Sequence, residues 1–408
     1  MQKIITFTFI LLSYSAIAQQ VLLSGKLMDS ERNEIAFAAI VSQNTGKGTS
    51  SDEYGNFKMN LSSLNDSLKI HVLGYEPLTY PIYSVKINDT LLIVLKRKSF
   101  VLPVVTVKPL DPIEVLKMVI ENLPSNLSSE KHTYKAFYRQ FHKEDGQAAR
   151  LIESALNVYH PGNTVNVKTG EIKEKIQVLK LRRSNVYEKN GDEHDNHLND
   201  MLLQNIGFYN HGSVLNPKGW KYYKFKIFYP DHNNNNKVIV SYIYENSSDL
   251  KLDYGSIGID LTDFSILFIS QESIMNINYF SAYGADNWKY LKGSISICYK
   301  KVDGKMFTDS INFYYKHNVI SKKYLNKIFT VEEYFDFYTD DISFTEQATK
   351  EHKHMHNLYT KKYEYEESFW TEYPLLLKHP LPFDWQKGME RNESLDKQFE
   401  KNERFRIN

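Results

Sequence analysis

Apolar and polar residues alternate along much of the chain with a period of two, which is typical of β-strands that bury one face. Near the N-terminus, such runs cover residues 21–28, 35–41, 67–73 and 90–95, and turns rich in Gly, Asn, Asp and Ser separate them. Short strands at this spacing favour a β-sandwich of about seven strands. We expect this sandwich within residues 19–97.

Residues 48–57 predict a strand end, a tight turn and a new strand. Asp52 can accept hydrogen bonds from the amides ahead of it, and Gly55 stands where a type I turn favours glycine. Phe57 then points into the core. For both Asp29 and Asp52 we prefer turn capping to a calcium pair, because isolated aspartates commonly cap turns.

Several short motifs share the order and spacing of a known module: residues 24–29, 36–40, 48–57 and 73–75. They resemble the carboxypeptidase-like regulatory domain, a small transthyretin-like, immunoglobulin-like sandwich that is abundant in exported proteins of the Bacteroidetes. The residues that carry the resemblance are Gly25, Asp29, Gly48, Asp52, Gly55, Phe57, Gly74 and Tyr75. The resemblance implies an accessory module without peptidase chemistry of its own.

A linker with one extended segment is expected at residues 98–110, and a helix follows it. Asp111 is a candidate N-cap, with Pro112 at the first helical position and Glu114 at the third. Leu123 and Pro124 are expected to end this helix. The apolar residues Ile113, Leu116, Val119 and Ile120 recur on one helical face, so we expect the helix to pack on the following sheet.

The second domain is expected at residues 111–408. Alternation recurs at residues 133–140, 222–228 and 237–244, and Asp303-Gly304 is a strong hairpin signal. The sum predicts a mainly β protein in which a large curved antiparallel sheet follows the sandwich and the helix. A charged terminal helix is expected around residues 390–405. This arrangement resembles the C-terminal half of uncharacterised Bacteroidetes proteins that carry the same sandwich.

The composition supports a strand-rich, multidomain protein. The chain has 408 residues, of which 42% are hydrophobic and 14% aromatic, and aromatic side chains suit pleated surfaces. The formal net charge is +1, and loss of Lys3 with the N-terminal segment brings it to zero. This near-neutral balance argues against a nucleic-acid partner.

Residues 1–18 read as a secretory signal peptide. Lys3 is followed by an apolar run, and Ala16-Ile17-Ala18 is a small-x-small cleavage pattern that leaves Gln19 as the first mature residue. The leader is too short to span a membrane, and no cysteine near the cleavage point allows lipid attachment. We therefore expect an exported protein of the periplasm or outer-membrane surface, without a transmembrane helix in the mature chain.

Catalytic motifs are absent from the sequence, and we expect no catalytic residues, cofactor or metal site. The best metal candidates are His352, His354 and His356, but their polar, lysine-rich surroundings favour a solvated loop. Cys298 alternates within a strand pattern and is expected to be a buried structural thiol. His142 and Glu144 read as an exposed pair after a strand.

Phe369, Trp370, Tyr373, Phe383 and Trp385 are interleaved with prolines. They predict an irregular segment pinned against a sheet, with a sugar- or peptide-binding platform as the alternative.

These observations favour a non-enzymatic binding or scaffold protein of the cell envelope, with an envelope protein or a hydrophobic or extended ligand as its partner. One alternative is a hydrolase whose site is assembled from scattered residues of the second domain. A second alternative is an outer-membrane barrel component, which the few and polar predicted strands and the lack of a terminal aromatic disfavour.

Overall fold

The computed structural model divides into two compact units, residues 1–106 and 107–408. The described residues are 21–35, 38–44, 48–51, 54–61, 64–72, 75–83, 85, 90–97, 110–162, 174–186, 198, 201–202, 214–229, 236–244, 251–280, 287–321, 327–345, 348–349, 351, 358 and 361–402.

The first unit contains two small sheets, with strand orders β4-β1-β7 and β3-β2-β5-β6. β1 and β7 run parallel, and the other neighbouring strands run antiparallel. The strands are β1 Val21–Asp29, β2 Ala39–Ser42, β3 Gly48–Ser50, β4 Asn56–Leu61, β5 Ser67–His71, β6 Leu78–Pro81 and β7 Thr90–Leu95.

The inner faces of these sheets meet in one apolar core. Buried and exposed residues alternate strictly along β7, as the sequence pattern predicts for a half-buried strand. Leu27, Ile40, Phe57, Leu68 and Ile93 all lie in this core. The predicted β-sandwich is confirmed. The proposed linker falls on residues 98–110, of which 98–109 lie outside the described residues.

The second unit begins with helix α1, Pro112–Asn126. The Asp111 side chain accepts a hydrogen bond from the Ile113 amide at 2.8 Å, as an N-cap does. The prediction that the helix ends at Leu123–Pro124 is wrong, because Pro124 lies inside the last turn. A proline removes only one N–H donor there, and the Leu127 amide closes the turn on the Leu123 carbonyl at 3.0 Å.

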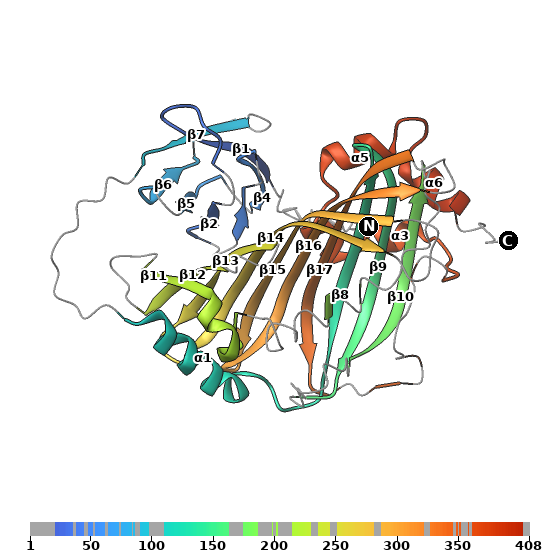
Figure 1. Cartoon of the computed structure of the whole chain (residues 1–408). Helices are drawn as coiled ribbons and strands as arrows, with labels where there is room; N and C mark the ends of the chain where they lie inside the picture. The colour runs from blue at the N-terminus through green and yellow to red at the C-terminus, as the bar shows by residue number, and fades with distance from the viewer. Residues whose placement is uncertain are drawn as a thin grey trace, which may run out of the picture. The chain divides into compact units, whose positions relative to one another are not determined.

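A ten-stranded sheet makes up most of the second unit (Figure 1), with the order β10-β9-β8-β17-β16-β15-β14-β13-β12-β11. Every neighbouring pair is antiparallel, which confirms the predicted large antiparallel sheet. The strands are β8 His132–Glu144, β9 Gln147–His160, β10 Lys175–Asn185, β11 Tyr223–Phe228, β12 Lys237–Tyr244, β13 Lys251–Asp260, β14 Ser265–Phe280, β15 Asn287–Val302, β16 Lys305–Ser321 and β17 Lys327–Ser343.

Two tight hairpins use the same turn chemistry. Asp303 and Gly304 have φ values of 50° and 76°, and Asp145 and Gly146 have values of 48° and 75°. Two consecutive positive φ angles are typical of type I′ turns, whose twist matches that of the flanking strands. The hairpin predicted at Asp303-Gly304 is confirmed.

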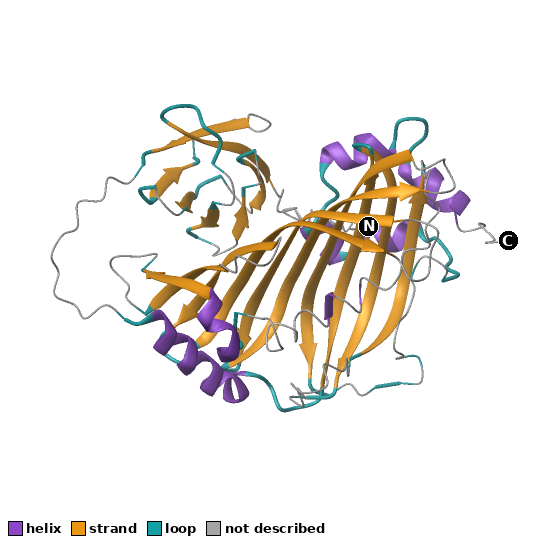
Figure 2. Ribbon diagram, viewed as in Figure 1, coloured by secondary structure: helices purple, strands orange, loops and turns teal. Residues whose placement is uncertain are grey.

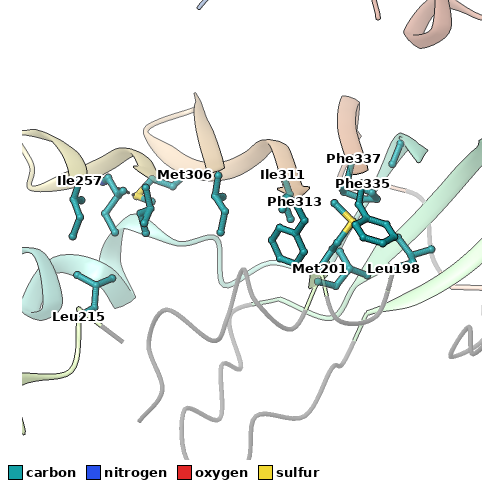
Figure 3. Close-up of a cluster of buried hydrophobic side chains, with 14 of the residues drawn as sticks. Leu198, Met201, Leu215, Ile257, Met306, Ile311, Phe313, Phe335 and Phe337 are labelled. Carbon is teal, nitrogen blue, oxygen red and sulfur yellow. Dashed lines mark hydrogen bonds between the residues drawn. The ribbon is translucent and has the colours of Figure 1, made fainter. Parts of the chain in front are cut away.

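One face of the large sheet is apolar and filled by the protein's own side chains. Helix α1 packs on it through Val115, Leu116 and Val119, and the 3-10 helix η1 (Pro217–Tyr222) adds Trp220. Figure 3 shows part of this core. The labelled residues from the sheet are Ile257, Met306, Ile311, Phe313, Phe335 and Phe337, and those that pack on them are Leu198, Met201 and Leu215.

Four short helices lie at the β8–β10 end of the sheet (Figure 2): α3 Glu367–Glu372, α4 Pro374–Lys378, α5 Phe383–Met389 and α6 Leu395–Asn402. They contact β17, β8, β9 and β10. The terminal helix predicted around Leu395 and Phe399 is present as α6, and residues 403–408 lie outside the described part. Within the described residues, no helix is both long enough and apolar enough to cross a membrane.

Candidate functional site

The three histidines considered as metal ligands, His352, His354 and His356, lie outside the described residues. Within the described part of the chain, no group of three or more His, Cys, Asp or Glu side chains is arranged to hold a metal ion.

Two glycines of the first unit make room for close contacts. Gly25 pairs with Phe57 across β1 and β4, and a Cβ on Gly25 would lie 2.3 Å from the Phe57 ring. Gly55 has a φ of +77°, and a Cβ there would lie 2.4 Å from the Leu27 carbonyl oxygen. Gly48 begins β3. Of the other motif residues, Asp52 and Gly74 lie outside the described residues.

Asp29 ties together three parts of the first unit. Its carboxylate accepts hydrogen bonds from the Glu31 and Asn33 amides at 2.9 and 2.8 Å, and from Arg97 Nη2 at 2.8 Å. The Tyr75 hydroxyl also donates to it, at 3.5 Å. The pKa of Asp29 lies well below its usual range, chiefly because the Asn33 side chain donates a hydrogen bond to the carboxylate. Burial opposes this shift, and the remaining hydrogen-bond donors add to it. Its role is structural: it closes the turn after β1.

His142 and Glu144 do not form the expected exposed pair. Strand β8 continues through both residues, and both side chains are buried. His142 Nε2 lies 3.4 Å from one oxygen of Glu144, and Nδ1 lies 3.4 Å from one oxygen of Glu333. Burial alone would lower the pKa of His142, but the two carboxylates outweigh burial and raise it. The sequence could not reveal this because Glu333 comes from β17, far away in the chain.

On the face opposite the apolar core, one row of polar side chains crosses all ten strands. Residues in register on neighbouring strands point to the same face. From β11 to β10 the row consists of Lys226, Ser241, Ser256, Ser270, Ser296, Asn312, Asp336, Arg139, Glu153 and Arg182. We call this row the polar row.

The β10 end of the polar row is a buried ionic network. Glu153 accepts from Arg139 Nε at 2.7 Å and from Arg182 Nε at 2.7 Å. Burial raises the pKa of Glu153, but Arg182 and Arg139 outweigh it and hold this pKa below its ordinary value. For Asp336, by contrast, burial raises the pKa above its ordinary value. Arg139 Nη1, 3.9 Å from the Asp336 carboxylate, offsets this effect of burial only in part.

The C-terminal helices pack over this ionic end. The guanidinium of Arg182 lies over the rings of Trp370 and Phe399, at 4.5 and 4.7 Å from their centroids. The Trp385 ring stacks on Phe141 at 4.2 Å. Tyr373 donates to a carbonyl of β8 at 3.0 Å. Trp370, Tyr373 and Trp385 are therefore held against the sheet, as expected. Trp370 and Trp385 lie on short helices and Tyr373 between two of them, rather than in an irregular segment. Phe383 does not follow the prediction, because it is largely exposed.

Beyond Asn312 the polar row consists of partly exposed serines, and it ends at Lys226 on β11. We call its four serines, Ser241, Ser256, Ser270 and Ser296 on β12–β15, the serine face. Each is intermediate in exposure, whereas the opposite-facing neighbours Val240, Ile257, Ile269 and Ile297 are fully buried.

Two larger side chains border the serine face. A Cβ on Gly258 would lie 2.3 Å from the Phe268 ring, so this ring lies flat on the sheet over the glycine. Cys298 is in register with Phe268. Its thiol is half-buried rather than fully buried, and burial raises its pKa. A raised pKa keeps the thiol protonated and unreactive at neutral pH.

Residues 23–107 match the family of the CarboxypepD_reg-like domain. The N-terminal unit is a carboxypeptidase-regulatory-like domain. The match extends ten residues past the predicted end of the sandwich at residue 97. The glycines and Asp29 described above are therefore structural features of this regulatory-like domain. No curated protein matches the chain.

One solved structure that matches is described as "lipid-protein interactions in lipovitellin". The sequence identity is 7% and the TM-score 0.25, and the match covers 56% of this chain and 27% of that one. Similarity this low gives no basis for inference about the second unit.

The sequence contains a signal for the polar row within one strand. Ser294-Ile295-Ser296-Ile297 shows serine on one face of a strand and isoleucine on the other. Likewise, Arg139 stands within the predicted strand at residues 133–140. The row itself appears only when the strand order is known, because its members are spread from residue 139 to residue 336.

Proposed function

We propose that the protein is an exported, non-enzymatic binding protein of the cell envelope. The regulatory-like domain serves as an accessory module, and the second unit presents the serine face of its sheet to an extended partner. The observation that carries this proposal is the difference between the two faces of the sheet: the apolar face is filled by the protein's own core, whereas the serine face is partly exposed to solvent.

This difference favours one of the kinds of ligand considered above. A hydrophobic ligand needs apolar surface that can be removed from water. Side chains of α1 and η1 already occupy that surface among the described residues. A polar, extended partner that meets hydroxyl groups on a sheet is therefore favoured over a lipid-like ligand.

The test is site-specific photo-crosslinking in cells. A photoreactive amino acid at position 270 on the serine face is expected to give a crosslinked product with one defined partner, identified by mass spectrometry. The same amino acid at Ser129, an exposed position before β8, serves as the control. Equal products from the two positions, or none from position 270, would contradict the proposal.

Export is tested separately. Cleavage after Ala18 would leave Gln19 as the first residue, two residues before β1 begins, so the mature chain would keep the whole strand. An Ala18→Trp substitution removes the small residue that cleavage requires. We expect an uncleaved precursor, seen as a slower band on gels. A wild-type protein that retains Met1 in the cytoplasm would overturn this part of the proposal.

Metal analysis addresses the hydrolase alternative. We expect purified protein to carry no stoichiometric zinc. Zinc at one equivalent that is lost when His352, His354 and His356 are replaced by alanine would favour a metal-dependent enzyme instead.

A further inference from the structure

The chain's own residues 379–385 already lie against the polar row at its β17 and β8 strands. The His379 ring stacks on Tyr338 with 3.6 Å between centroids, and Trp385 packs on Tyr334 at 4.8 Å. Tyr338 and Tyr334 lie on β17, two residues to either side of Asp336, so the two contacts fall on opposite sides of the row. The segment therefore crosses it.

Main-chain groups of the same segment bind the row directly. Arg139 donates from Nη2 to the His379 carbonyl at 2.9 Å and from Nη1 to the Pro380 carbonyl at 3.3 Å. The segment thus uses two ring anchors and main-chain carbonyls, with Pro380 and Pro382 between the anchors. Residues 379–382 are the part before helix α5, which begins at Phe383 and carries the Trp385 anchor. Prolines favour an extended backbone, and hence reduce the entropy that this part loses on binding.

The same pattern of side chains continues onto the serine face. Asn312 links the two parts, because its Nδ2 donates to Asp336 at 2.7 Å. Beyond it, Tyr254 lies two residues from Ser256, and Phe268 lies two residues from Ser270 on the other side of the row. Aromatic rings therefore border the row on both sides here, as they do where residues 379–385 cross it. The Ser256 and Ser270 hydroxyls lie 2.9 Å apart, so one of them donates to the other. A serine hydroxyl that donates away from the sheet can replace Arg139.

Charge narrows the chemistry of the partner. Between Lys226 on β11 and Asp336 on β17, the polar row carries no ionisable group, and the nearby Lys292 and Glu272 pair with each other at 3.6 Å. A charged peptide would lose hydration there without gaining an opposite charge, so an uncharged segment is favoured.

We propose that the serine face binds an extended, uncharged, proline-containing peptide segment of a partner protein, with aromatic side chains as anchors. The mode of binding repeats that of residues 379–385. This inference rests on the proposed function and names its partner class. A peptide is favoured over a glycan, because the chain itself supplies an example of peptide binding on the same row.

The probe is a synthetic peptide that copies residues 379–385 with Asn in place of Asp384 (His-Pro-Leu-Pro-Phe-Asn-Trp), amidated at its C-terminus and labelled with a neutral fluorophore, titrated with the full mature chain and followed by anisotropy. We expect saturable binding. Ser270→Glu places a carboxylate among the hydroxyls, which repels peptide carbonyls, and we expect it to raise the Kd roughly tenfold or more. Ser129→Glu, on the exposed segment before β8, should leave the Kd unchanged.

A second variant tests whether the loss of binding in Ser270→Glu could result from misfolding. Phe268→Ala removes a proposed anchor without adding charge, and it should also raise the Kd. The far-UV circular dichroism of both variants should match that of the wild type. If binding is unaffected by Ser270→Glu and by Phe268→Ala, the peptide is only displacing residues 379–385, and the inference is overturned.

Two outcomes separate this inference from the proposed function. A defined crosslinked partner at position 270 without any binding of the peptide would overturn the inference and leave the proposed function standing. If a neutral oligosaccharide binds and Ser270→Glu abolishes that binding, the partner is a glycan rather than a peptide. This result would also overturn the inference and leave the proposed function standing. Failure of both the crosslink and the peptide would overturn both.

Discussion

At the scale of single residues, two glycines have nearly the same backbone conformation in different surroundings. Gly55 has a φ of +77° and Gly304 a φ of +76°, but only Gly55 would place a Cβ against backbone atoms. No atom lies within 4 Å of the corresponding position at Gly304. Substituting each glycine by alanine therefore measures two separate energetic costs. At Gly304 the cost is that of a positive φ alone, and at Gly55 a steric clash is added to it.

We therefore expect Gly304→Ala to lower the free energy of unfolding of its unit by about 1 kcal/mol, the usual cost of a left-handed alanine. Gly55→Ala should cost about 3 kcal/mol or more, because the Leu27 carbonyl must also move. Urea unfolding followed by far-UV circular dichroism measures both. Equal losses would show that the first unit relaxes around the added methyl group.

Glu153 gives a prediction about pH. Removing one partner of a buried ion pair typically costs about 3–5 kcal/mol, so Glu153→Gln should destabilise the second unit by this amount at neutral pH. Folding lowers the pKa of Glu153. Its contribution to the free energy of unfolding is therefore fully present above the pKa of the unfolded state, near 4.5. This contribution is lost as the pH falls through the lower pKa of the folded state.

Urea titrations between neutral pH and about pH 3 check this prediction. The wild type should lose more stability on acidification than Glu153→Gln does. Glu372→Gln, on the exposed side of α3, should follow the wild-type curve. A Glu153→Gln curve parallel to that of the wild type would contradict the assigned role.

At the scale of elements, the sequence predicts strand faces better than strand partners. Alternation identified β7 and β12 with their boundaries, because burial on one face leaves a period of two. It did not show that β17 pairs with β8, since pairing depends on side chains that are distant in sequence. For this reason alternation alone does not predict the polar row, nor the burial of His142 against Glu333.

Helix α5 offers a matched pair of aromatic residues. Trp385 stacks on Phe141, whereas Phe383, two residues earlier, is 64% exposed. Trp385→Ala should destabilise the second unit by about 2–4 kcal/mol, somewhat below the range for fully buried aromatics. Phe383→Ala should change stability by less than about 0.5 kcal/mol.

Urea unfolding followed by circular dichroism is again suitable, because it does not depend on the tryptophan that is removed. Similar small effects of the two substitutions would mean that α5 is not held to the sheet by its stack. The crossing of the polar row by residues 379–385 would then lose one of its two anchors.

At the scale of the whole molecule, each unit has its own apolar core. One core cluster consists of residues between Leu23 and Leu95, and the largest cluster consists of residues between Val115 and Leu358. A unit with its own core can unfold cooperatively by itself. The four tryptophans of the chain, at positions 220, 288, 370 and 385, all belong to the second unit.

We therefore expect two thermal transitions by calorimetry, of which tryptophan fluorescence reports only one. Gly55→Ala should lower the midpoint of the fluorescence-silent transition and leave the other unchanged. Glu153→Gln should do the reverse. A single transition that both substitutions shift equally would show that the two units unfold together.

The pairing of β17 with β8 has a consequence for how the chain acquires its structure. The two strands are adjacent in the sheet, yet Phe335 pairs with Gln140, almost two hundred residues earlier. Contacts between residues so far apart form slowly, because a long loop must close before they can contribute. Until residue 343 has been synthesised, one edge of β8 lacks its neighbour and can pair with other chains. The second unit should therefore depend on a chaperone or on delayed folding during its biogenesis, and chains truncated before β17 should aggregate.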